Sequence, residues 1–127
     1  MEPQLDHERL EVYQLWRKLN RQIAELIAST PPRMLKGHAE GIDNLRRGIK
    51  SIGRNLAEGA GRWTTADKVH RYHIARGSGT ESAASLDEFV DFGVFTEEQI
   101  RPAKRTIVRI VSMLTSLIRA TEEFADR

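Results

Sequence analysis

Two histidines at helical spacing are the first residues in this sequence that could do chemistry. His70 and His73 lie three residues apart and Asp67 precedes His70 by three, so on a helix the three side chains would share one face and could ligate a metal ion. A di-metal helical bundle needs such ligand pairs on facing helices, and the sequence has no second motif of this kind. His7 and His38 stand alone. We therefore interpret these histidines as polar surface residues and predict no metal and no other cofactor.

Motifs for nucleophilic catalysis and for phosphate-binding loops are also missing. No serine lies in the Gly-x-Ser-x-Gly turn that exposes a nucleophile. The glycine-containing stretches GAGR (59–62) and GSG (77–79) do not continue into the Gly-Lys-Ser/Thr of a phosphate-binding loop. The sequence therefore predicts a protein that is not an enzyme.

Charge is unevenly distributed along the chain, although it nearly cancels overall. The formal net charge is +2, yet residues 33–76 carry ten Lys or Arg against four Asp or Glu, and residues 77–100 carry six acidic residues and no basic one. An antiparallel helical bundle would bring most of these opposite charges together. A cationic stripe would remain on the second helix, formed by Arg46, Arg47, Lys50 and Arg54. Two interpretations stay open for the cationic stripe: solvated or intersubunit ion pairs, or contacts with the phosphate backbone of RNA or DNA.

The elements that would position these residues are four amphipathic helices. Apolar residues recur at steps of three and four from Val12 to Ile27, and again from Ile42 to Leu56. The prolines at 31 and 32 end the first helix, because a residue before proline is pushed out of the α region. The third helix is predicted to begin near Thr64, with a weak capping partner three residues later, and to end at Gly93.

The fourth helix is predicted from a capping box, Thr96 with Gln99, followed by an apolar heptad stripe from residue 100 to Phe124. Pro102 predicts a kink or a later helix start. Several large apolar residues lie outside or at the edge of the predicted stripes, and such residues favour self-association. They are Val108, Val111 and Ile118 in the fourth helix, and Trp16 and Ile27 in the first.

These helices predict an all-α, antiparallel up-down four-helix bundle, formed by one domain over residues 1–127. No apolar run approaches the roughly 20 residues that span a bilayer, so no membrane partner is expected. The absence of cysteine suits a cytoplasmic protein.

The end of the second helix carries a second polar stripe, formed by Ser51, Asn55, Glu58 and Arg62. Gly59 or Gly61 is the expected left-handed residue after the helix, because glycine adopts that conformation without a Cβ penalty. Gly53, inside the helix, predicts a close backbone contact. Glu58 opposes the helix dipole, so Arg62 or the free N–H groups of the next helix should compensate it.

The sequence around the corner between the second and third helices also resembles that of a known family. Asn55, Leu56, Ala57, Glu58 and Gly59, followed by Ile74, Ala75, Gly77 and Ser78, are similar to the two motifs of the four-helix bundle proteins encoded within 23S rRNA intervening sequences, the S23-type family. The resemblance implies a left-handed bundle that assembles as a homopentamer and is not an enzyme. This family is similar to the accessory bundle proteins of diversity-generating retroelements, so the resemblance also implies RNA or DNA, and a reverse transcriptase, as possible partners. The alternative is a protein-interaction scaffold that binds no nucleic acid.

Overall fold

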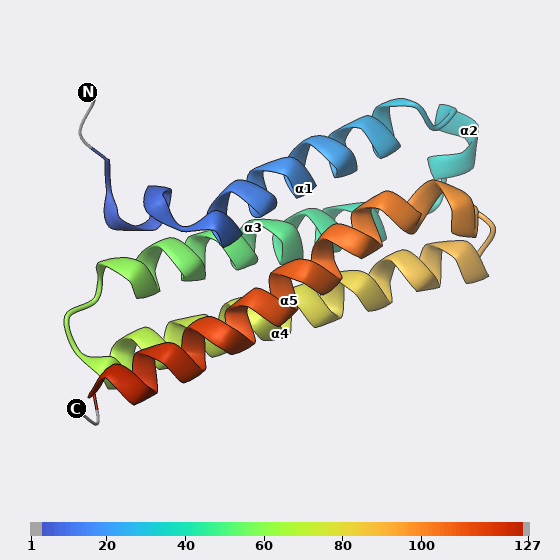
Figure 1. Cartoon of the computed structure of the whole chain (residues 1–127). Coiled ribbons are helices and arrows are strands. Elements are labelled where there is room, and N and C mark those ends of the chain that lie inside the picture. Colours follow the sequence, from blue (N-terminus) through green and yellow to red (C-terminus); the bar gives the residue numbers. More distant parts are fainter. Residues whose placement is uncertain (1–3, 126–127) are drawn as a thin grey trace.

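The computed structural model describes residues 4–125, which form a bundle of helices (Figure 1). Residues 1–3 and 126–127 of the predicted domain lie outside the described residues. The elements are the short 3-10 helix η1 (Asp6–Arg9), α1 (Glu11–Ala28), the single-turn α2 (Pro32–Leu35), α3 (Ala39–Gly61), α4 (Thr65–Asp91) and α5 (Glu97–Ala125).

The four long helices run alternately in opposite directions along the bundle (Figure 1). α3 packs most extensively against α4, α4 against α5, and α5 against α1, while α1 and α3 make a sparser contact that closes the ring. The predicted all-α bundle is thereby confirmed, and its left-handed twist stays a prediction. None of the helices in the described part of the chain is long and apolar enough to cross a membrane.

The predicted helix ends are largely confirmed. α1 ends before Ser29, and α4 begins after Thr64, whose Oγ1 accepts a hydrogen bond from the backbone N–H of Asp67 at 3.2 Å. Gly93 follows α4 with a φ of 76°, the left-handed conformation that favours glycine.

The start of α5 differs from one of the two alternatives predicted for Pro102. Thr96 Oγ1 accepts from the N–H of Gln99 at 3.1 Å, and Gln99 Oε1 accepts from the N–H of Thr96 at 2.8 Å. This capping box begins the helix at Glu97, and Pro102 lies inside it. A later start is therefore wrong. Two satisfied N–H groups at the cap outweigh the one hydrogen bond that the proline removes.

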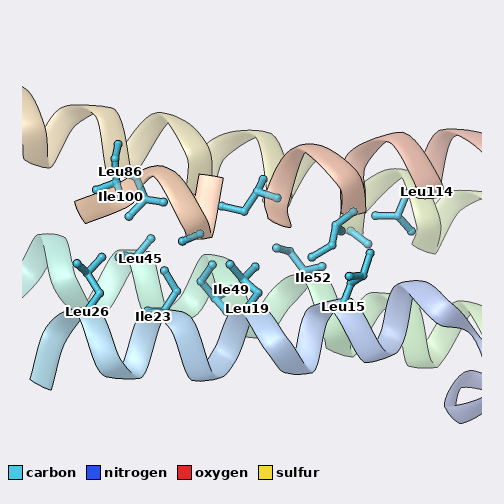
Figure 2. Packing of buried hydrophobic residues seen from close by; sticks show 14 of the residues in the cluster. Leu15, Leu19, Ile23, Leu26, Leu45, Ile49, Ile52, Leu86, Ile100 and Leu114 are labelled. Carbon is cyan, nitrogen blue, oxygen red and sulfur yellow. The ribbon is translucent and has the colours of Figure 1, made fainter. Parts of the chain in front are cut away.

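The core runs along the centre of the bundle, where large aliphatic side chains from all four long helices point toward one another (Figure 2). Leu19 of α1, Leu45 of α3, Leu86 of α4 and Leu114 of α5 are completely buried. The apolar stripes read from the sequence therefore meet in one contiguous core.

The C-terminal half of α5 departs from the predicted heptad stripe. Ile118, predicted to lie outside the stripe, is only 5% exposed, whereas Phe124, predicted inside it, is 76% exposed. A straight helix has 3.6 residues per turn and drifts by about 20° per heptad, so the buried face moves away from a strict seven-residue repeat. Of the other residues predicted at an edge, Val108 is exposed, while Trp16, Ile27 and Val111 are half-buried.

Small residues let the helices approach closely. A Cβ built on Gly48 of α3 would lie 2.8 Å from Ser82 Oγ of α4, and one on Gly79 of α4 would lie 3.1 Å from a methyl group of Val111 in α5. The helices therefore approach one another closely around these small residues.

Candidate functional site

A chain of polar contacts joins α3 to α4 near the corner between them. The hydroxyls of Ser51 and Ser78 are hydrogen-bonded at 2.8 Å. Asn55 Nδ2 donates to the backbone carbonyl of Ser51 at 2.9 Å and to its hydroxyl at 3.1 Å. The two sequence motifs, 15 or more residues apart, thus meet through Ser51, Asn55 and Ser78.

Arg71 of α4 completes this chain of contacts and was not among the predicted site residues. Its Nη1 donates to Asn55 Oδ1 at 3.3 Å and lies 3.2 Å from Glu58 Oε2. Arg62 Nη2 lies 3.6 Å from the same carboxylate oxygen. The predicted compensation of Glu58 by Arg62 is confirmed, and Arg71 is its closer partner. The only indication of this role in the sequence was the position of Arg71 in the second turn of the next helix.

The predicted left-handed glycine at the end of α3 is wrong. Among the described residues, positive φ occurs only at Gly37 and Gly93, whereas Gly59 and Gly61 both belong to α3. Lys68 of α4 satisfies the end of the helix instead, because its Nζ donates to the carbonyls of Gly59 at 3.3 Å and Ala60 at 2.9 Å. A cation at a helix C-terminus also compensates the helix dipole.

Two glycines of α3 make room for aromatic rings. A Cβ on Gly53 would lie 2.1 Å from the ring of Trp16, whose Nε1 donates to the carbonyl of Ile49 at 2.8 Å. A Cβ on Gly59 would lie 2.6 Å from the ring of Tyr72. The predicted close contact at Gly53 is confirmed. Gly59 likewise makes room for the ring of Tyr72. Burial of Tyr72 raises its pKa above the ordinary value, and the negative charge of Asp6 adds a smaller effect in the same direction.

Gly61 and Gly77, also predicted as motif residues, have open space around them. A Cβ on either glycine would meet no atom within 4 Å outside its own helix, and both residues are exposed. Neither glycine adopts a positive φ, so within residues 4–125 neither packing nor backbone conformation requires glycine at these two positions.

The cationic stripe lies on the outer surface of α3. Arg46, Arg47, Lys50 and Arg54 are all exposed, and within residues 4–125 none of them forms an ion pair. In the sequence, Asp43 lies one turn before Arg46 and Arg47, and Glu58 lies one turn after Arg54.

Arg46 and Lys50 also border a groove of about 360 Å³ between α3 and α1. Its apolar lining includes Ile23, Ile27 and Ile49. The groove follows from the sparse contact between these two helices. The cationic stripe therefore has an apolar neighbour that the sequence patterns did not indicate.

The predicted cancellation of opposite charges is confirmed only in part, because among the described residues no basic residue of 33–76 forms an ion pair with an acidic residue of 77–100, and two cations of α5 pair with other helices instead. Lys104 of α5 pairs with Asp87 in the acidic half of α4, and Arg109 lies 3.9 Å from Glu11 of α1. Arg76 Nε donates to Thr115 Oγ1 at 2.8 Å. The cationic stripe on α3 is thus one of several groups of cations that have no ion-pair partner among residues 4–125.

His70 and His73 are exposed on α4. In the part of the chain that the structure describes, no three His, Cys, Asp or Glu side chains are grouped so that they could hold a metal ion.

We expect Glu58→Ala to lower the free energy of unfolding by about 0.2–1 kcal/mol, because the Glu58 side chain is half-exposed and exposed ion pairs contribute no more than this. Urea unfolding followed by circular dichroism measures the loss, with Glu81→Ala as the control that removes an exposed carboxylate with no ion-pair partner among the described residues. The loss should shrink in 1 M salt, where the Debye length is about 3 Å. A loss that persists in high salt would contradict this explanation.

Comparison with known proteins places this arrangement in a family. The family model for the 23S rRNA-intervening sequence protein matches residues 8–116. A crystal structure from Bacteroides thetaiotaomicron, described as a protein of unknown function from the S23 ribosomal protein family, superposes with a TM-score of 0.68 at 18% sequence identity, covering 87% of this chain and 99% of that one. Among curated proteins none matches the sequence. The structural likeness concerns the fold alone, but the family model spans both motifs of the α3–α4 corner, and the chain therefore belongs to the 23S rRNA-intervening sequence protein family.

Proposed function

We propose that this protein is a non-enzymatic, cytoplasmic helical bundle that self-associates and contacts the backbone of RNA or DNA through the cationic stripe. The observation that carries the proposal is the set of four exposed cations on α3 that have no ion-pair partner among residues 4–125. The stripe spans about 12 Å along the helix, at 1.5 Å per residue, a length that matches a few phosphates of a nucleic acid. Phosphate contacts of this kind give affinity with little sequence preference.

Self-association is part of the proposal because one stripe is a weak polyanion site. With a net charge of only +2, a single chain offers little non-specific attraction. A ring of identical subunits, a homopentamer by the family resemblance, repeats the stripe and lets weak contacts add along one polyanion. Large apolar side chains exposed in the single chain support an assembly: Leu5, Phe92 and Val108.

The test measures the binding of RNA and DNA oligonucleotides by fluorescence anisotropy at about 50 to 300 mM salt. Light scattering first checks that the protein is assembled, with a mass at least twice the 14.5 kDa of one chain. We expect the double variant Arg47→Gln/Arg54→Gln to bind more weakly and to flatten the salt dependence by about 0.9 per lost phosphate contact on duplex DNA, or about 0.7 on single strands.

The matched control is Lys104→Gln/Arg109→Gln. It removes the same charge from two cations that already pair with Asp87 and Glu11, so its salt dependence should stay close to that of the parent protein. Absence of any complex at 50 mM salt with assembled protein would contradict nucleic-acid binding.

The groove between α1 and α3 favours a second candidate, a protein-interaction scaffold. Its isoleucine lining suits the apolar side chains of a partner protein, and Arg46 and Lys50 at its rim suit acidic side chains beside them. Under this alternative, the assembled protein binds no nucleic acid, and substitutions in the groove affect a protein complex instead.

A further inference from the structure

Trp63 is the most exposed large apolar side chain in the described part of the molecule. It is 97% exposed, whereas Trp16, the other tryptophan, packs over Gly53 and donates a hydrogen bond. Tryptophan is strongly buried on average, so an indole left entirely in water is unusual. Such a ring has a large flat surface available for a ligand.

The segment that holds Trp63 is short and fixed at both sides. It consists of residues 62–64, between the end of α3 and the start of α4. The N–H of Arg62 donates to the carbonyl of Gly59 at 3.2 Å, and Thr64 caps α4. The backbone of Trp63 is therefore held between the ends of the two helices.

Basic residues outnumber acidic ones in the segment of the chain around Trp63, and this segment directly follows the cationic stripe in the sequence. Residues 54–71 contain four basic side chains, of Arg54, Arg62, Lys68 and Arg71, against the two carboxylates of Glu58 and Asp67. Arg54, at the end of the stripe, lies about 10 Å along the helix axis before the end of α3 at Gly61, and Trp63 follows two residues later. A strand whose phosphates lie on the stripe would thus reach the indole within a few nucleotides.

We infer that Trp63 is a stacking platform for an unpaired base of a single-stranded nucleic acid whose backbone lies along the cationic stripe. The inference rests on the proposed function and specifies its ligand. Aromatic side chains beside a cationic track bind single strands without sequence preference, because every base has a π-face. The faces of bases inside a duplex are covered by their stacked neighbours, so the site selects single-stranded over double-stranded ligands.

Phe124 provides a contrast at the same end of the bundle, where α5 ends near the α3–α4 corner (Figure 1). It is also highly exposed, at 76%, but it follows Glu122 and Glu123 directly. A polyanion would be repelled from this ring. Phe124 is therefore exposed but lies next to acidic residues, whereas the segment around Trp63 is mainly basic.

The test titrates the full chain with an oligo(dT) single strand and with a duplex of the same length at fixed salt. Stacking is worth about 1–3 kcal/mol per base, so Trp63→Ala should weaken single-strand binding by about 5- to 150-fold and leave duplex binding unchanged. Trp63→Phe should restore most of the affinity, because it keeps an aromatic face. Binding should quench the tryptophan fluorescence of the parent protein, and this quenching should be lost in Trp63→Phe.

The control Phe124→Ala should bind the single strand as the parent protein does. If Trp63→Ala binds the single strand with unchanged affinity while Arg47→Gln/Arg54→Gln binds more weakly, the stacking site is refuted and the proposed function stands. Equal losses for single strand and duplex in Trp63→Ala would also refute stacking. If the parent protein binds neither ligand, both the proposed function and the stacking site are wrong.

Discussion

Gly53→Ala is expected to lower the free energy of unfolding by about 0.5–4 kcal/mol, after subtraction of the gain of about 0.5–1 kcal/mol that alanine brings as the better helix former. The added Cβ would lie 2.1 to 2.5 Å from three ring atoms of Trp16, so the indole must move away. Overpacking of this kind costs about 1–3 kcal/mol, and loss of the hydrogen bond from Trp16 to the carbonyl of Ile49 adds about 0.5–1.5 kcal/mol. Urea unfolding at fixed protein concentration measures the change.

Gly77→Ala is the matched control for this substitution. Gly77 also lies inside a helix, but a Cβ there meets nothing within 4 Å. The control should therefore stabilise the protein by about 0.5–1 kcal/mol, the ordinary advantage of alanine over glycine in a helix. If both variants shift stability in the same direction, the packing of Trp16 on Gly53 does not explain the glycine.

Gly59→Val is expected to destabilise the bundle by about 1–3 kcal/mol, through overpacking and not through backbone strain. Its Cβ would lie 2.6 Å from Tyr72 Cε1 and 3.1 Å from Arg71 Cβ, and Tyr72 is buried. Displacing the Tyr72 ring would expose it to water. Thermal unfolding followed by circular dichroism measures the loss of stability. Ultraviolet titration of the tyrosines measures the exposure of Tyr72, because exposure should lower the pKa of Tyr72 toward its ordinary value.

Gly61→Val is the control for Gly59→Val, because position 61 has open space and an ordinary helical φ. It should change stability by less than about 1 kcal/mol, the difference between valine and glycine in a helix. A large loss at position 61 would indicate that the end of α3 requires glycine for its backbone, contrary to the structure.

The helices and most of their ends could be predicted because their signals are local. The cap at Thr64, the capping box at Thr96 and the left-handed Gly93 each involve residues within one turn of one another. The apolar periodicity likewise reports on one helix at a time. Gly53 could be interpreted correctly because a glycine on an apolar helix face has few explanations other than a close contact.

The errors arose where the outcome depends on a neighbouring helix. The end of α3 contains three glycines within nine residues, which locally favours a left-handed cap, but Lys68 reaches across from α4 and satisfies the last carbonyls. Near the end of α5, Ile118 is buried although it lies outside the heptad stripe, and Phe124 is exposed although it lies inside it. A small angular drift accumulates along the helix, and the positions of the other helices decide which side chains are covered.

For the candidate site, the sequence by itself determined the residue types: a run of cations on α3 and a polar corner with Asn55 and Glu58. The tertiary structure decided which charges remain unpaired, because opposite charges far apart in sequence, such as Lys104 and Asp87, meet only when the helices pack. It also decided that Arg71 joins the corner and that Trp63 stands in water. Exposure and ion pairing are properties of neighbouring surfaces, and a linear sequence does not contain the distances between them.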